Sequence, residues 1–100
     1  MSRTARMEIA SYPLGTEDAS ISREVSRVFE VLDRSGFPYE MTVMGTVVEG
    51  SPERLFALAA EIHAVMFSDA VNRVVTVIRV DERTSRKETV RETTRFQPSE

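Results

Sequence analysis

The sequence predicts an α+β fold in which two helices cover one face of a four-stranded antiparallel sheet. Three observations lead to this expectation. Two segments repeat apolar residues at helical spacing, four short segments alternate as strands do, and the segments follow one another in the order β-α-β-β-α-β. In a chain of 100 residues, this order is typical of the ferredoxin-like, or split βαβ, sandwich.

The four strand segments are recognised by two-residue alternation and β-branched residues. They are residues 7–12, 37–44, 46–49 and 72–81. The first six residues lack apolar periodicity and are expected to be a frayed lead-in. The first strand ends where Pro13 and Gly15 favour a turn, and Gly45 bends or breaks the chain between the second and third strands.

The two helical segments are recognised by apolar stripes. The first stripe consists of Ile21, Val25, Val28, Phe29 and Leu32. We expect Ser20 to be the N-cap of this helix and Gly36 to end it. The second stripe consists of Leu55, Leu58, Ala59, Ile62 and Met66. Ser51 as the cap and Pro52 in the first turn mark its start, and its end is expected near Ser68.

The sheet face away from the helices is expected to be partly apolar. Val75 and Val77 alternate with the inward residues of the fourth strand, and at least some of Met41, Val43 and Val48 should also point away from the helices. Burying apolar surface contributes about 25 cal/mol per Å². This face therefore favours a dimer through the sheet, or a tetramer built from such dimers.

One compact domain is expected over residues 7–83, followed by a charged tail over residues 84–100. Val90 and Phe96 are the only strongly apolar residues of the tail, so the tail cannot form a core of its own. Charged residues over 87–95 would pair at i, i+3 and i, i+4 in a short docked helix. A disordered tail is the alternative.

Composition limits the function. The chain has no Cys, so it has no disulfide, thiolate nucleophile or Cys-ligated zinc. No membrane span or leader peptide is recognisable, and we expect a cytoplasmic protein. Between Met7 and Asp81, twelve acidic side chains stand against six basic ones, a formal charge of −6. This charge disfavours nucleic acid and suits a small cation, although solubility alone also accounts for it.

Searches for catalytic motifs find no Walker loop, GxGxxG, HExxH or GxSxG. His63 is the only histidine, so one protomer cannot build a two-histidine metal site or assemble a nucleophile, a base and an orienting acid. We therefore expect no catalysis, no metal and no cofactor, although a site shared between subunits would escape this argument. A structural or surface role for His63 is preferred to a ligand contact.

Two segments are harder to explain by packing alone. Tyr12 to Gly15 leads into a polar helix start, and Met44 to Gly50 places glycines around Thr46 and Glu49. Glycine allows a ligand to approach the backbone closely. An equally open interpretation is that the two glycines of the second segment serve only a bend and a turn.

These segments also carry a family resemblance. The motifs are PLG at 13–15, MGTxxEG at 44–50 and EIH at 61–63. In this order and spacing, the chain from Met7 to about Arg83 resembles the small thiamine-binding protein family. The resemblance implies a ferredoxin-like fold and assembly into dimers or tetramers by sheet packing. It also implies non-catalytic binding of thiamine or its hydroxymethylpyrimidine moiety, for vitamin B1 salvage, delivery or sensing, with no essential metal.

The candidate ligand-binding residues are Leu14, Ser20, Ser22, Met44, Thr46, Glu49 and His63. The resemblance selects the positions, and side-chain chemistry gives the roles. Thiamine has a flat aminopyrimidine and a cationic thiazolium, so we expect Met44 and Leu14 against the ring, the hydroxyls as hydrogen-bond partners and Glu49 as the anionic partner. His63 is a secondary candidate. A Glu49→Ala variant should lose most ligand affinity with the fold intact.

Two other classes of function remain open. The domain could be a regulatory module for another metabolite, such as an amino acid or a nucleotide-like effector, because ferredoxin-like domains pair their sheets to make such sites. It could also be a structural oligomer without a ligand. In that case the region around Thr46 and Glu49 would have no pocket.

Overall fold

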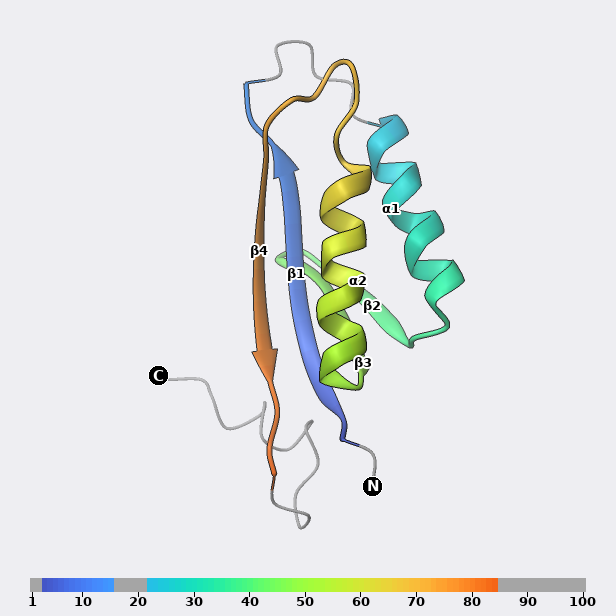
Figure 1. Cartoon of the computed structure of the whole chain (residues 1–100), viewed down its shortest axis with the longest axis vertical. Coiled ribbons are helices and arrows are strands. Elements are labelled where there is room, and N and C mark those ends of the chain that lie inside the picture. Colours follow the sequence, from blue (N-terminus) through green and yellow to red (C-terminus); the bar gives the residue numbers. More distant parts are fainter. Residues whose placement is uncertain (1–2, 16–21, 85–100) are drawn as a thin grey trace.

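The computed structural model describes residues 3–15 and 22–84. Within them the elements are β1 (Ala5–Pro13), α1 (Ser22–Ser35), β2 (Tyr39–Thr42), β3 (Gly45–Gly50), α2 (Pro52–Val65) and β4 (Val74–Asp81) (Figure 1). The predicted order β-α-β-β-α-β is confirmed. Ser20, Ile21 and the candidate helix over 87–95 lie outside the described residues.

The four strands form one antiparallel sheet in the order β2-β3-β1-β4. Both helices lie on the same side of the sheet, with α2 running along β1 and α1 beside it (Figure 1). This arrangement confirms the ferredoxin-like sandwich. Ile9 lies opposite Thr46 of β3 and opposite Ile78 of β4, so the side chains of these three residues share the face toward the helices.

The core lies between the sheet and the two helices. All five residues of the predicted α2 stripe are buried, which confirms the register of that helix. The first four of them form a core cluster with Met7, Ile9 and Val48 from the sheet and Leu32 from α1. Full burial of one such side chain contributes about 1.5–3 kcal/mol to folding. Val25 and Phe29 of the predicted α1 stripe are different, because each keeps more than a third of its surface exposed.

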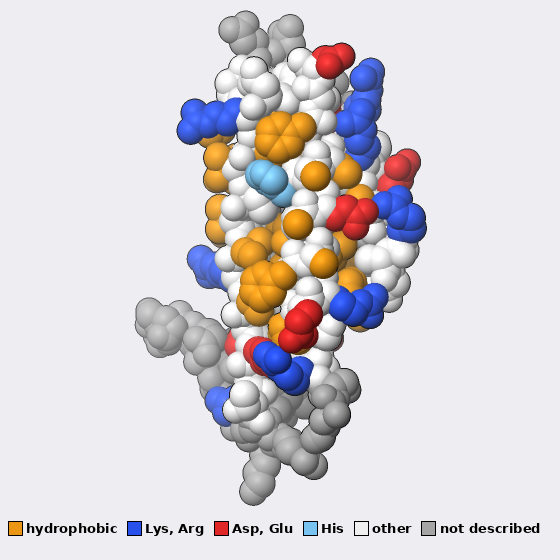
Figure 2. All heavy atoms as spheres, viewed as in Figure 1, with side chains coloured by type: hydrophobic (Ala, Val, Ile, Leu, Met, Phe, Trp, Pro, Cys, Tyr) orange, Lys and Arg blue, Asp and Glu red, His pale blue; other side chains and the backbone are white. Residues whose placement is uncertain are grey.

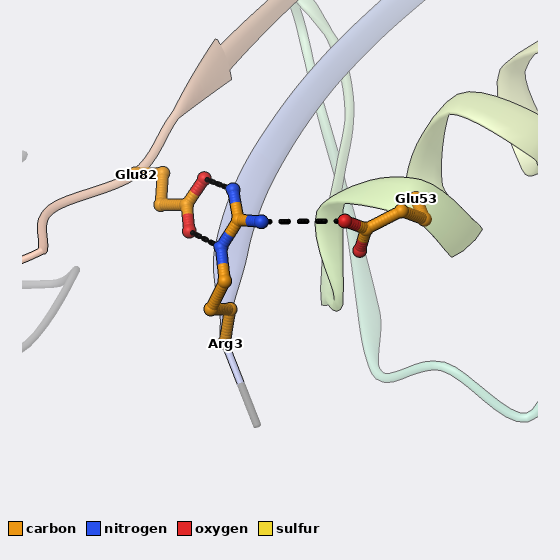
Figure 3. A network of polar contacts seen from close by, with 3 residues as sticks. All are labelled: Arg3, Glu53 and Glu82. Carbon is orange, nitrogen blue, oxygen red and sulfur yellow. Dashed lines mark hydrogen bonds and ion pairs between the residues drawn. The ribbon is translucent and has the colours of Figure 1, made fainter. Parts of the chain in front are cut away.

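Several element boundaries differ from the predicted ones. β1 begins at Ala5, inside the expected frayed lead-in, because Ala5 pairs with Gly50 and Arg6 with Glu49. Just before β1, the guanidinium of Arg3 donates to both carboxylate oxygens of Glu82, which follows β4 at the same end of the sheet, at 2.6 and 2.7 Å (Figure 3). A weaker contact of 3.3 Å joins the same guanidinium to Glu53 at the start of α2.

β2 is shorter than expected, because the chain turns at Val43 and Met44 instead of continuing as a strand. The Thr42 hydroxyl closes this turn, donating to the Gly45 carbonyl at 2.8 Å and accepting from the Met44 N–H at 3.1 Å. Threonine hydroxyls commonly stabilise turns in this way.

α1 ends at Ser35, before Gly36, as the sequence predicts. α2 starts as predicted, with Pro52 after Ser51, but the Ser51 side chain makes no capping hydrogen bond; its extended backbone accepts from the Leu55 N–H instead. α2 ends at Val65, earlier than expected. Arg27 of α1 donates to carbonyls just there, at Val65 and Phe67, which satisfies acceptors that a helix end leaves unpaired.

The outer face of the sheet carries Val75 and Val77, as expected, beside Tyr12 and Ala10 of β1. Val77 is 48% exposed. The expectation for Val48 was wrong: it is 0% exposed, because its pairing with Met7 places it on the helix face. Met41 lies on that same face, opposite Thr46.

Neither helix of the described part of the chain is long and apolar enough to cross a bilayer.

Candidate functional site

A cavity of about 300 Å³ lies between α1 and the sheet, at the end where the β2–β3 hairpin turns. The hairpin lines it with Met41, Thr42, Val43, Met44, Gly45 and Thr46. The two helices line it with Val25, Val28, Phe29, Leu32, Ile62 and Met66, and β1 lines it with Ile9, Ala10 and Ser11. None of these described lining residues has a charged side chain. The exposure of Val25 and Phe29 is explained by their position at this cavity.

The cavity adjoins the end of the β1–β3 ladder. Ile9 and Thr46 form the last pair of that ladder, and Gly45, the first residue of β3 after the turn, has a φ of +147°. A Cβ atom at Gly45 would lie 2.6 Å from the Ile9 carbonyl oxygen. At Gly50 a Cβ atom would instead meet the Phe37 ring at 2.4 Å. Close packing within the chain therefore accounts for glycine at both positions.

Thr46 is the most enclosed polar residue of the cavity, with 8% of its surface exposed. Its hydroxyl donates to the Met41 sulfur at 3.3 Å. A thioether is a weak acceptor, so a ligand nitrogen or oxygen would be a better partner for this hydroxyl. Met44 stands at the mouth with 71% of its surface exposed, beside the half-exposed Met41. The site thus combines an enclosed hydroxyl with a flexible, polarisable rim.

Of the residues expected at the site, Met44 and Thr46 are brought together by the cavity, whereas Leu14 and Glu49 do not line it. Leu14 continues past β1, where its N–H donates to the Arg73 carbonyl at 2.9 Å. Glu49 belongs to the outer face of the sheet, and its carboxylate lies 3.3 Å from the Arg6 guanidinium. One residue along a strand reverses the face, so Thr46 and Glu49 point to opposite sides.

The structure says less about the two candidate serines. Ser20 lies outside the described residues, and Ser22 is the first residue of α1. His63 lies near the end of α2 and does not line the cavity. Its ring meets Phe67 edge to face, with 5.4 Å between the ring centroids.

Ser11, Thr46 and Thr76 carry hydroxyl groups at strand positions that face the helices, where the neighbouring positions are mostly apolar. Only Thr46 was identified as a candidate from the sequence. Ser11 follows Met7 and Ile9 on the helix face of β1, and Thr76 precedes Ile78 on that of β4. A hydroxyl group on the buried face of a strand needs a hydrogen-bond partner. The alternation of each strand could therefore have marked Ser11 and Thr76 as candidate polar residues. Ser11 lines the cavity, and its hydroxyl forms a hydrogen bond with that of Thr76.

Among the described residues, no three His, Asp or Glu side chains gather as metal ligands would. The buried Glu24, 3% exposed, is held by Ser68, whose hydrogen bond lowers the pKa of the Glu24 carboxyl. The arrangement suits recognition of an uncharged, flat ligand by apolar contact and hydroxyl groups.

Comparison with known proteins points to one family. The sequence model described as thiamine-binding protein matches residues 7–96. The UPF0045 protein YqgV of Bacillus subtilis is 34% identical over 87 residues, which are 83% of this chain and 84% of that protein. The crystal structure of MJ1052 from Methanocaldococcus jannaschii superposes with a TM-score of 0.76 and 31% identity, covering 93% of this chain and 94% of that one.

A third similarity concerns the fold alone. The crystal structure of TM0486 from Thermotoga maritima, provisionally assigned to thiamine biosynthesis or salvage, has a TM-score of 0.71 and 19% identity. It covers 94% of this chain and 99% of that one. The family match spans nearly the whole sequence and includes every residue that lines the cavity. The chain therefore belongs to the thiamine-binding protein family.

Proposed function

We propose that this protein binds thiamine, or its hydroxymethylpyrimidine moiety, without transforming it, in the cavity between α1 and the β2–β3 hairpin. Its role would be in the salvage, delivery or sensing of vitamin B1. The observation that carries the proposal is that Met44, Gly45 and Thr46, the first three residues of the MGTxxEG motif, line this cavity in a member of the thiamine-binding family.

The dimensions favour the pyrimidine half of the vitamin inside the cavity. Ligand pockets usually measure roughly 300–1,000 Å³, and this one has about 300 Å³. Its apolar walls suit the two faces of a flat ring. Met41 and Met44 add sulfur–aromatic contacts at the rim, each worth about 0.3–1.5 kcal/mol.

Hydroxyl groups would orient the ring. Thr46 has a proton to donate to a ring nitrogen, in exchange for its present bond to the Met41 sulfur. Ser11, which also lines the cavity, offers a second polar group on the β1 side. One neutral hydrogen bond of this kind contributes about 0.5–1.5 kcal/mol.

The charge distribution supports a position for the thiazolium outside the cavity. The described lining residues are neutral, and burying an isolated cation among them would carry a large desolvation cost. Glu49, the anionic partner expected from the sequence, lies on the outer face of the sheet. We therefore place the thiazolium cation at the solvent-exposed mouth of the cavity beside Met44, where the acidic domain attracts it only at long range.

Calorimetric titration of the purified protein tests the proposal. Thiamine, hydroxymethylpyrimidine and the thiamine phosphates are the ligands, and amino acids and nucleotides form the comparison panel. We expect binding of the pyrimidine compounds, weakened about three- to tenfold by Thr46→Val. Thr4→Val, at an exposed position before β1, is the matched control and should bind as the wild type does.

Flat traces for every pyrimidine compound would refute the proposal. Binding of a compound from the comparison panel alone would favour a regulatory module for another metabolite. If none of the compounds binds, the structural oligomer without a ligand is left, although the cavity at Thr46 is the feature that this alternative does not predict.

We also propose that the protein is a homo-oligomer, a dimer or tetramer, assembled through the outer face of the sheet. Val75, Val77, Ala10 and Tyr12 form an apolar patch at one end of this face. The opposite end is charged and carries the pairs Arg6–Glu49 and Glu8–Arg79. The apolar end would form the packed part of the interface, and the charged end would lie at its polar edge.

Sedimentation analysis checks the assembly. Val77→Arg places a charge inside the apolar patch and should shift the protein to monomers. Ser26→Arg adds the same charge on the exposed part of α1 and should leave the assembly intact. If the wild type already sediments as a monomer, or if Val77→Arg changes nothing, the outer face is not the interface.

A further inference from the structure

Three side chains form a hydrogen-bonded chain that runs from the cavity to His63 of α2. Ser11 lines the cavity and is bonded to Thr76, and the Thr76 hydroxyl lies 2.7 Å from Nδ1 of His63. The three residues come from β1, β4 and α2. The imidazole at the far end reaches the surface, where it is the pale blue side chain in Figure 2.

The protons in this chain cannot be arranged independently. Thr76 has one hydroxyl proton and two bonded neighbours, so it can donate to only one of them. If Nδ1 of His63 carries no proton, Thr76 donates to it and must accept from Ser11. The Ser11 proton is then committed to Thr76, and only oxygen lone pairs remain for a group inside the cavity.

The opposite arrangement presents a different group to the cavity. If Nδ1 of His63 carries a proton, it donates to Thr76, and Thr76 can then donate to Ser11. The Ser11 proton is released from the chain and can be donated to a ligand. Whether Nδ1 of His63 carries a proton therefore decides whether Ser11 acts as an acceptor or as a donor.

We propose that His63 and Thr76 are positioning residues that hold Ser11 as a hydrogen-bond acceptor, so that the cavity prefers a ligand with an amine at this point. Neutral histidine more often carries its proton on Nε2, which leaves Nδ1 as the acceptor for Thr76. A 4-aminopyrimidine ring donates to Ser11, whereas the corresponding oxopyrimidine brings a carbonyl oxygen against the Ser11 lone pairs. This inference rests on the proposed function and deepens it by naming what the site selects.

Two observations support a role beyond packing. Thr76 and Ser11 are hydroxyl residues in strand phases that otherwise carry apolar side chains, so each takes the place of a residue that would add to the core. The series of hydrogen bonds also begins at a residue that lines the cavity and ends at an imidazole. A purely structural hydroxyl could be satisfied by the backbone without reaching a cavity or an imidazole.

The tautomer of His63 is the first test, and it needs no ligand. Because the protein has one histidine, a long-range proton–nitrogen NMR correlation of the labelled protein at neutral pH reports that ring alone. We expect the proton on Nε2 and an unprotonated Nδ1. A proton on Nδ1 in the neutral ring overturns the proposal.

Ligand selectivity is the second test, with thiamine compared with oxythiamine, in which a carbonyl oxygen replaces the amine. We expect the wild type to prefer thiamine by about tenfold or more. Thr76→Val breaks the chain and should reduce this preference to about threefold or less, and His63→Phe should do the same while keeping a ring against Phe67. Thr76→Ser keeps the hydroxyl and should restore the preference.

A general loss of stability would lower both affinities together and leave their ratio unchanged, so the ratio separates positioning from structure. An unchanged ratio in Thr76→Val, with Thr4→Val as the control, overturns the proposal. If neither compound binds the wild type, the proposed function fails and the selectivity fails with it. The NMR result then still decides the arrangement of protons in the chain.

Discussion

Replacing Gly45 by alanine tests whether the geometry of the cavity depends on the close approach of β1 and β3. Gly45 has φ of +147°, a conformation that residues with a Cβ atom rarely adopt. The added Cβ atom would also lie 2.6 Å from the carbonyl oxygen of Ile9, a backbone atom in the centre of the sheet. The clash cannot be relieved by a side-chain rotation.

Gly36→Ala provides a matched control. Gly36 also has a positive φ, +79°, but nothing lies within 4 Å of the position that its Cβ atom would take. Holding a residue with a Cβ atom in a conformation of positive φ costs about 1–2 kcal/mol. At Gly45 a displacement of the β1 backbone is added, comparable to overpacking at about 1–3 kcal/mol. We therefore expect Gly45→Ala to lower the free energy of unfolding by about 2–5 kcal/mol and Gly36→Ala by about 1–2 kcal/mol.

Urea unfolding followed by circular dichroism measures both changes, provided that the slope of the free energy against urea concentration stays the same. Calorimetry gives a second readout, because Gly45 lines the cavity and Gly36 does not. Ligand affinity should fall in Gly45→Ala and stay unchanged in Gly36→Ala. Equal losses of stability in the two variants would refute the reasoning, since they would show that the contact with Ile9 has no energetic effect.

Three further predictions concern the core, the pH dependence and the two faces of the sheet. Leu55→Ala, at a side chain with no exposed surface, should cost about 2–5 kcal/mol in urea unfolding; a loss below 1 kcal/mol would contradict the assigned core. The hydrogen bond from Arg3 lowers the pKa of the Glu82 carboxyl, and that from Ser68 lowers the pKa of Glu24. Both contributions are complete above about pH 5 and are lost as the pH falls through the lowered pKa, so stability should decline less steeply in acid when both residues are changed to Gln; parallel curves would count against this. Glu49→Gln should keep the pyrimidine affinity that Thr46→Val loses, and the reverse result in calorimetry would move the site to the outer face.

The arrangement of the elements could be predicted because it depends on local patterns. The α2 stripe from Leu55 to Met66 has the helical period, and Gly36 ends α1 where its positive φ is needed. Strand ends were less predictable, because pairing decides them. Ala5 and Arg6 become part of β1 only because Gly50 and Glu49 lie opposite them.

The cavity was predictable only in part. The glycine-flanked segment pointed to Thr46 and Met44, which lie in the wall. Phe29 and Met41 contribute to the same wall from elements that come together only in the folded chain, and their sequence pattern is that of ordinary core residues. Val48 shows the same limit, since a valine in a strand does not reveal which face it occupies until the register is known.

The position of β1 in the middle of the sheet has a consequence for how the chain is made. β1 is the first described strand to leave the ribosome, yet one of its two neighbours is β4, the last. The eight residue pairs between them join distant parts of the sequence, and such non-local contacts slow folding. A nascent chain that has not yet reached Val74 exposes one edge of β1, a template on which other chains can aggregate. A chaperone that shields this edge should therefore raise the yield of the native protein more than stabilising the helices would.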